Sequence, residues 1–120
     1  MISFLAILFL PWVAPTAWAY TEDYYALQFY VGFGLIEDGP AVEWDLGYDY
    51  GQIDYLWTKY PGAMSASESE PPDPLAPGMP YPLDRASAAD YEADALLALA
   101  YGQWHASGYY EAMAERCAAK

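Results

Sequence analysis

Seven of the ten prolines in this 120-residue chain fall within residues 61–84, and they divide the sequence into two parts. Proline lacks a backbone N–H donor and has a fixed φ, so neither a regular helix nor an interior strand can run through such a stretch. Residues 65–70 add a polar run, Ser-Ala-Ser-Glu-Ser-Glu, without apolar periodicity. Residues 61–84 are therefore predicted to be an extended or disordered linker, partly polyproline II, between segments 20–60 and 85–120.

The segment before the linker alternates between apolar residues and polar or small ones. Residues 24–35 and 41–50 both follow a period of two, and residues 37–40 between them, Glu-Asp-Gly-Pro, form a turn signal. Residues 53–60 continue the alternation as a third strand. This spacing predicts an antiparallel β-meander over residues 20–60, with one apolar face and one acidic or small face.

The segment after the linker has helical periodicity. Its apolar stripe consists of Ala93, Leu96, Leu97, Ala100 and Trp104. Gly108 interrupts this stripe, and Met113 and Cys117 resume it. The pattern predicts two helices over residues 85–120 that join near Gly108 as a helical hairpin. Meander, linker and hairpin together predict an α+β fold.

Residues 97–117 resemble one helix pair of the tetratricopeptide repeat. The large, small, aromatic, glycine and aromatic positions of that repeat are matched roughly by Leu97, Ala100, Trp104, Gly108 and Tyr110. Such repeats need about three copies to bury a continuous core, and the likeness occurs once. The resemblance therefore implies a helical hairpin with some bias toward protein binding.

The N-terminus carries no charged side chain from residue 1 to residue 20. Its apolar run is followed by Ala-Trp-Ala at residues 17–19, a small-x-small site of the kind that signal peptidase cleaves. Residues 1–19 are predicted to be a signal peptide, so the protein is expected to be exported, periplasmic or extracellular. Two alternatives stay open: a retained membrane anchor, and an apolar N-terminal segment in the core of a cytoplasmic protein.

The charge of the chain is strongly one-sided. Asp and Glu number 17 against 4 Lys and Arg, for a formal net charge of −13. A field of this sign repels phosphate backbones, so direct nucleic-acid binding is not expected. The charge favours a basic protein partner, while simple solubility of an aromatic-rich surface is the alternative explanation.

Catalytic chemistry has little support in the residues. The chain holds one histidine, His105, and one cysteine, Cys117, which could meet across the helical hairpin as a thiolate pair. No metal-binding or triad motif surrounds them. The carboxylates Glu43, Asp45 and Asp49 would share one strand face, which is usually a solvated face. We therefore expect no catalytic residues, no metal site, no cofactor and no enzymatic activity.

The strongest concentration of binding-type residues lies in the predicted meander. Tyr48, Tyr50 and Trp57 offer aromatic surface, and Asp45 and Asp49 lie on the acidic face of the strand that carries Tyr48 and Tyr50. These five residues are the predicted site for a basic protein partner. The leading hypothesis is a small, acidic, exported binding or structural subunit. The alternative is a cytosolic acidic inhibitor of the phage type, which occupies a basic nucleic-acid site by mimicking its charge.

Overall fold

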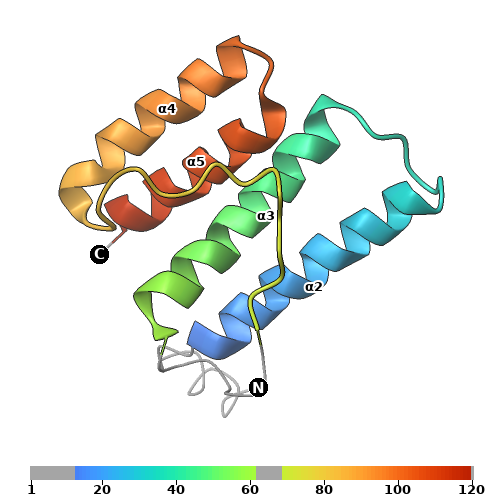
Figure 1. Cartoon of the computed structure of the whole chain (residues 1–120), viewed down its shortest axis with the longest axis horizontal. Coiled ribbons are helices and arrows are strands. Elements are labelled where there is room, and N and C mark those ends of the chain that lie inside the picture. The colour runs from blue at the N-terminus through green and yellow to red at the C-terminus, as the bar shows by residue number, and fades with distance from the viewer. Residues whose placement is uncertain (1–12, 62–68, 120) are drawn as a thin grey trace, which may run out of the picture.

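The residues that the structure describes, 13–61 and 69–119, form helices joined by irregular segments, with no strand among them. The computed structural model places its α-helices side by side in the order α2 (Val13–Gly32), α3 (Pro40–Lys59), α5 (Trp104–Ala118) and α4 (Ala88–Ala100) (Figure 1). A short 3-10 helix, η2 (Arg85–Ser87), leads into α4. The predicted α+β fold and its β-meander over residues 20–60 are wrong, because this part of the chain is helical.

A second pattern overrides the alternation that predicted strands. Leu46, Tyr50 and Ile53 recur at intervals of four and three residues, so they share one face of α3, and all three are buried. Gly39 and Pro40, interpreted as a hairpin turn, instead begin this helix. Gly39 is the N-cap and Pro40 occupies the first turn, where its missing N–H donor is not needed.

Two glycines in the left-handed region end helices. Gly34, with φ of 72°, follows α2, and Gly102, also with φ of 72°, follows α4. At the second of these ends, the Gln103 N–H donates to the Ala98 carbonyl oxygen at 2.8 Å, which closes the last turn. The two C-terminal helices are therefore joined at residues 101–103, and the predicted junction near Gly108 is wrong.

Gly108 lies inside α5 because α3 and α5 pack backbone against backbone. A Cβ atom at Gly108 would lie 2.0 Å from the Trp44 carbonyl oxygen, and one at Gly47 would lie 1.9 Å from the His105 carbonyl oxygen. A Cβ atom at Gly51 would lie 2.7 Å from the nearest atoms of α5. Any larger side chain at these positions would force the two central helices apart.

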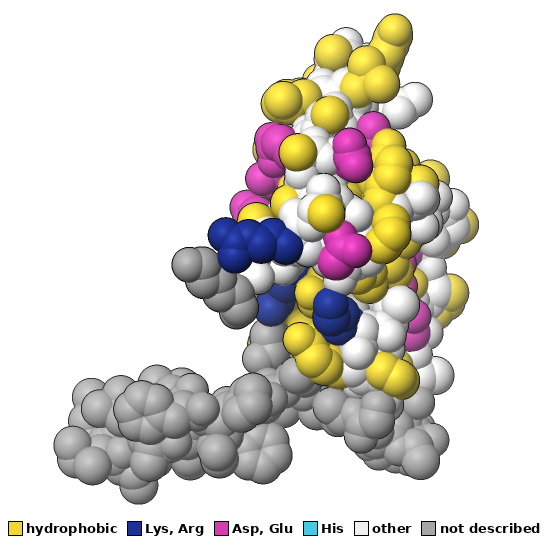
Figure 2. All heavy atoms as spheres, turned by 90° about the vertical axis from the view of Figure 1, so that its left-hand side faces the viewer, with side chains coloured by type: hydrophobic (Ala, Val, Ile, Leu, Met, Phe, Trp, Pro, Cys, Tyr) yellow, Lys and Arg dark blue, Asp and Glu magenta, His cyan; other side chains and the backbone are white. Residues whose placement is uncertain are grey.

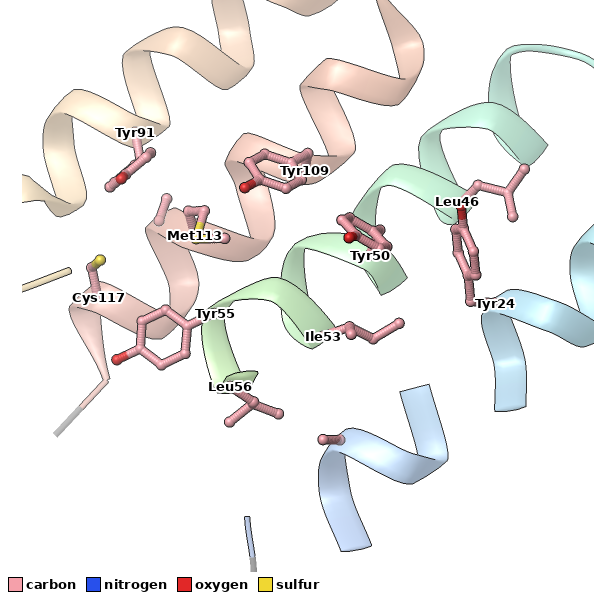
Figure 3. Packing of buried hydrophobic residues seen from close by; sticks show 12 residues of the cluster. Tyr24, Leu46, Tyr50, Ile53, Tyr55, Leu56, Tyr91, Tyr109, Met113 and Cys117 are labelled. Carbon is pink, nitrogen blue, oxygen red and sulfur yellow. The ribbon is translucent and has the colours of Figure 1, made fainter. Parts of the chain in front are cut away.

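Tyrosines dominate the core. Tyr24, Tyr50, Tyr91 and Tyr109 are buried, and they form a row across the helices together with Leu46 and Met113 (Figure 3). A buried phenol needs a hydrogen-bond acceptor, because an unpaired hydroxyl loses its water without compensation. Nearby carboxylates and backbone carbonyl groups outside the helices supply these acceptors.

Residues 69–84, which we call the strap, are the described part of the predicted linker, and they cross one face of the helical layer (Figure 1). The strap is extended, as the prolines require, but it packs on the core through residues that include Met79, Tyr81 and Leu83. Its carbonyl groups accept from buried tyrosines, at 2.7 Å from Tyr50 Oη to the Pro71 oxygen. Sequence spacing alone does not show this docking, since the strap lacks apolar periodicity.

Helix α2 begins at Val13 and therefore contains the predicted cleavage site at residues 17–19. Ala17 is 2% exposed and belongs to the core. Residues 1–12 of the predicted signal peptide lie outside the described residues, and export stays a prediction. Among the helices that the structure describes, none has the length and apolar character needed to cross a membrane.

Removal of residues 1–19 is expected to destabilise the helical layer. The truncation deletes Ala17 from the core and removes the first two turns of α2. We expect a loss of about 1 kcal/mol or more, because deletion of buried core atoms has this order of effect. Thermal unfolding of residues 20–120 against the full chain measures it. Equal melting temperatures would mean that these turns contribute nothing to the fold.

Candidate functional site

An acidic hollow of about 360 Å³ lies between α2 and α3. Asp23 on α2 faces Asp45 and Asp49 on α3, and the rings of Tyr30 and Tyr48 line the same hollow. Residues 45, 48 and 49 fall within about one turn of a helix, so they project toward one side. Three of the five predicted site residues, Asp45, Tyr48 and Asp49, are therefore brought together, on a helix rather than on a strand.

The negative charge of this hollow is not balanced. Burial, together with the nearby charges of Asp23 and Asp45, raises the pKa of the Asp49 carboxyl to about 7. No Lys or Arg lines the hollow among the described residues. A cation placed there would relieve both the repulsion and the cost of burial.

The described basic residues lie elsewhere, at the end of the molecule where α3 and α5 end and η2 begins. Lys59 donates to the Leu83 carbonyl oxygen at 2.7 Å, and Arg116 donates to Gln52. Figure 2 shows Lys and Arg side chains in the middle of the face it presents, with hydrophobic side chains spread from its upper to its lower end. These cations are engaged away from the acidic hollow.

Tyr48 forms a fixed wall of the acidic hollow. Its ring stacks on the Trp44 ring, with centroids 5.3 Å apart and an interplanar angle of 15°. Its hydroxyl donates to the Glu115 carboxylate on α5. Because both contacts hold the ring in place, a ligand that packs against Tyr48 would lose little side-chain entropy on that side.

The other two predicted site residues lie away from the acidic hollow. Tyr50 is buried in the core, and its hydroxyl donates to the strap. Trp57 is half-buried and packs against the core. On a helix they project roughly 120–140° away from Asp45, so they do not line the acidic hollow.

A second polar centre joins three elements around the single histidine. His105 Nε2 lies 2.7 Å from Asp73 Oδ2 on the strap, and His105 Nδ1 lies 3.5 Å from Glu43 Oε1 on α3. The Asp73 side chain is only 2% exposed. The sequence offered no signal for this centre, because 32 residues separate Asp73 from His105 and no motif links them.

The two partners of this centre hold each other in their charged forms. Burial alone would lower the pKa of His105, but the hydrogen bond and charge of Asp73, with Glu43 nearby, outweigh it and raise that pKa. Burial alone would raise the pKa of Asp73, but hydrogen bonds from His105 and from the Leu75 amide hold it below its usual range. This mutual support is typical of an ion pair shielded from water.

Two half-buried carboxyl groups meet where the strap packs on α3, Glu70 on the strap and Asp54 on the helix. The Tyr109 hydroxyl donates to Asp54, and the Tyr50 hydroxyl lies 3.2 Å from Glu70 Oε2. Burial, followed by the neighbouring Asp54, raises the pKa of Glu70 to about 8. Near neutral pH this group therefore retains its proton, which allows two carboxyl groups to lie side by side.

The hypothetical pair of His105 and Cys117 does not form. Both residues lie on α5, twelve positions apart, which corresponds to about 18 Å along a helix. Cys117 is buried and packs in the core. No group of three His, Cys, Asp or Glu side chains within the described ranges is arranged to hold a metal ion.

Comparison with known proteins found no match to this chain, neither among family models nor among curated proteins nor among solved structures. Function must therefore be argued from the acidic hollow and the histidine centre themselves. Of the two, the acidic hollow is the one that contains predicted site residues and an uncompensated charge.

Proposed function

We propose that this protein is an acidic binding module that engages a basic segment of a partner protein. A lysine or arginine side chain of the partner enters the acidic hollow and is shared by Asp23, Asp45 and Asp49. The observation that carries the proposal is the convergence of these three carboxylates without a basic residue beside them in the described chain. A bound basic side chain supplies the counter-charge that the free site lacks.

The walls of the acidic hollow suit the stem of a basic side chain. Tyr30 and Tyr48 flank the carboxylates, and aromatic faces attract ammonium and guanidinium groups. Beyond the hollow, Phe29 on α2 and Phe33 directly after that helix are exposed, and their ring centroids lie 4.4 Å apart with a tilt of 37°. Exposed aromatic rings beside a charged centre are typical of protein-binding surfaces.

A peptide with alternating arginine and glycine tests this proposal, with a citrulline peptide of the same length as its uncharged match. We expect the arginine peptide to bind and Asp49→Asn to weaken its binding about tenfold, because a charge-assisted contact is lost. Isothermal titration calorimetry at moderate ionic strength provides the dissociation constants.

The matched control is Asp90→Asn, which removes the same charge from an exposed position on α4. It should change the dissociation constant less than about twofold, since distant surface charges are screened. Equal weakening by Asp90→Asn and Asp49→Asn would show that only the overall charge matters. Equal binding of the citrulline peptide would show that the carboxylates do not recognise a cation.

A further inference from the structure

A second hollow, of about 310 Å³, lies beneath the strap. Its walls are mainly apolar and come from three directions, with Val31 on α2, Leu46 on α3 and Leu75 on the strap. The ring of Tyr24 also lines it. A hollow of this size, walled by apolar side chains and closed by polar groups at one end, has the general form of a small-molecule site.

The polar end of this hollow consists of Glu43 and His105. His105 is 9% exposed, and its Nδ1 atom has no hydrogen-bond partner and no contact with solvent. The other ring nitrogen is held by Asp73 at 2.7 Å. Buried polar atoms are nearly always paired, so an unpaired imidazole nitrogen at the wall of a hollow indicates a partner that binds there.

The available atoms define the chemistry of that partner. Glu43 offers carboxylate oxygens, and above its raised pKa His105 is neutral, with Nε2–H donating to Asp73 and a lone pair at Nδ1 beside Glu43. No Lys or Arg lines the hollow among the described residues. A ligand with N–H donors and a positive charge pairs with the Glu43 carboxylate, whereas an anion would be repelled.

We propose that the hollow beneath the strap binds a small molecule that joins a primary ammonium group to an apolar, ring-sized body. The ammonium donates to the Glu43 carboxylate, which lies 3.5 Å from Nδ1 of His105. The body packs between Val31, Leu46 and Leu75, against the ring of Tyr24. This site lies on a different side of α2 and α3 from the acidic hollow, and it shares no residue with it.

Binding at this site is linked to the protonation of His105. The titratable groups that face the imidazole are Asp73 on the strap, Glu43 on α3 and Tyr24 on α2, with Asp38 beside Glu43. A protonated imidazole directs its Nδ1–H toward Glu43 and therefore competes with the ammonium. Binding strengthens as the pH rises through the pKa of His105, and by reciprocity the bound amine lowers that pKa.

The test uses 2-phenylethylamine as the probe and 2-phenylethanol as its uncharged match. His105 is the only histidine of the chain, so its imidazole signals in nuclear magnetic resonance are unique. We expect a saturable shift of these signals with the amine and about tenfold weaker binding of the alcohol. Tenfold preference for the neutral imidazole moves the His105 titration midpoint down by about 1 pH unit.

Two variants separate this site from the acidic hollow. Glu43→Gln should weaken amine binding about tenfold, because it removes the negative partner. Asp49→Asn should leave amine binding at His105 unchanged. The proposal is overturned if the alcohol binds as well as the amine, if the His105 signals do not saturate, or if only Asp49→Asn weakens binding. The amine and alcohol comparison decides the question in the unaltered protein even if Glu43→Gln does not fold.

Discussion

Replacement of Gly108 by alanine is expected to lower the free energy of unfolding by about 3 kcal/mol or more. The added Cβ atom would lie 2.0 Å from the Trp44 carbonyl oxygen and 2.8 Å from the Tyr48 amide nitrogen. Both obstacles belong to the backbone of α3, so no side-chain rotation can relieve the overlap. The helices must separate, and Tyr109 and Met113, both fully buried, would lose contacts across the interface. Thermal unfolding should show a melting temperature lower by roughly 10–20 °C.

Gly32→Ala is the matched control for this substitution. Gly32 is the last residue of α2, and a Cβ atom there would meet nothing within 4 Å. Alanine has the higher helix propensity, so this variant should equal the wild type or exceed it by about 0.5 kcal/mol. If Gly108→Ala melted within a degree or two of Gly32→Ala, α3 and α5 would not be packed as closely as described.

The error in the predicted fold has a specific origin in α3. Val42, Trp44, Leu46, Tyr48 and Tyr50 alternate with polar residues, which satisfies a strand period. They also fit a helix, because this segment is so rich in apolar residues that these recur at helical spacing as well as at strand spacing. The spacing of glycines decides between the two, since small residues four apart let two helices approach closely.

The C-terminal helices were easier to predict because no competing alternation runs through them. Their helical periodicity agrees with α4 and α5. The predicted stripe on α4 is wrong, because Ala93, Leu96, Leu97 and Ala100 are exposed, whereas the buried face of α4 carries Tyr91, Ala95 and Ala98. The junction of the two helices was also misplaced, since Gly102 and Gly108 are both possible helix ends by sequence. What separates them is a tertiary contact, the approach of Gly108 to Trp44, which no local pattern contains.

Part of the candidate site could be predicted from α3 alone. Asp45 and Asp49 share a side of a strand and also lie four residues apart on a helix, so either fold keeps them together. Asp23 could not be predicted, because it comes from a different helix whose register depends on packing. The contact of His105 with Asp73 depends on the docking of a segment that has no periodic pattern.

The stability of this protein is expected to fall as the pH rises from 5 to 8. Three half-buried carboxyl groups are responsible. Burial and neighbouring acidic residues raise the pKa of Asp49 to about 7, of Glu70 to about 8 and of Glu111 to about 7. In the unfolded chain these groups titrate near pH 4. Between these values the native state binds more protons than the unfolded state, so deprotonation favours unfolding.

The histidine centre contributes in the same direction. Because folding raises the pKa of His105, its stabilisation is present below about pH 6.5, the unfolded pKa, and is lost as the pH rises through the folded pKa. Asp73 acts in the opposite direction but only in acid. Its lowered pKa gives stability that is present above about pH 4 and is lost as the pH falls through the folded value. Maximum stability is therefore expected in mildly acidic solution, between about pH 4 and 5.

Urea unfolding at pH 5 and at pH 8, at constant ionic strength, measures this dependence. We expect a decrease of at least about 2 kcal/mol, a figure well below the sum of the individual shifts because water screens partly exposed carboxyl groups. Asp49→Asn should raise stability at pH 8, where it removes a charge from a half-buried position. The same variant should change little at pH 5, where Asp49 is already protonated and an amide has nearly the same shape.

Glu37→Gln serves as the control, because Glu37 is exposed in the loop before α3. It should leave both measurements within about 0.5 kcal/mol of the wild type. Equal stability at pH 5 and pH 8 would contradict the raised pKa values of these carboxyl groups, and so would a Glu37→Gln effect equal to that of Asp49→Asn.

The same measurement of unfolding at pH 5 and pH 8 connects stability to the acidic hollow. A cation bound beside Asp49 lowers the pKa of that carboxyl, so the arginine peptide should restore stability at pH 8 and add much less at pH 5.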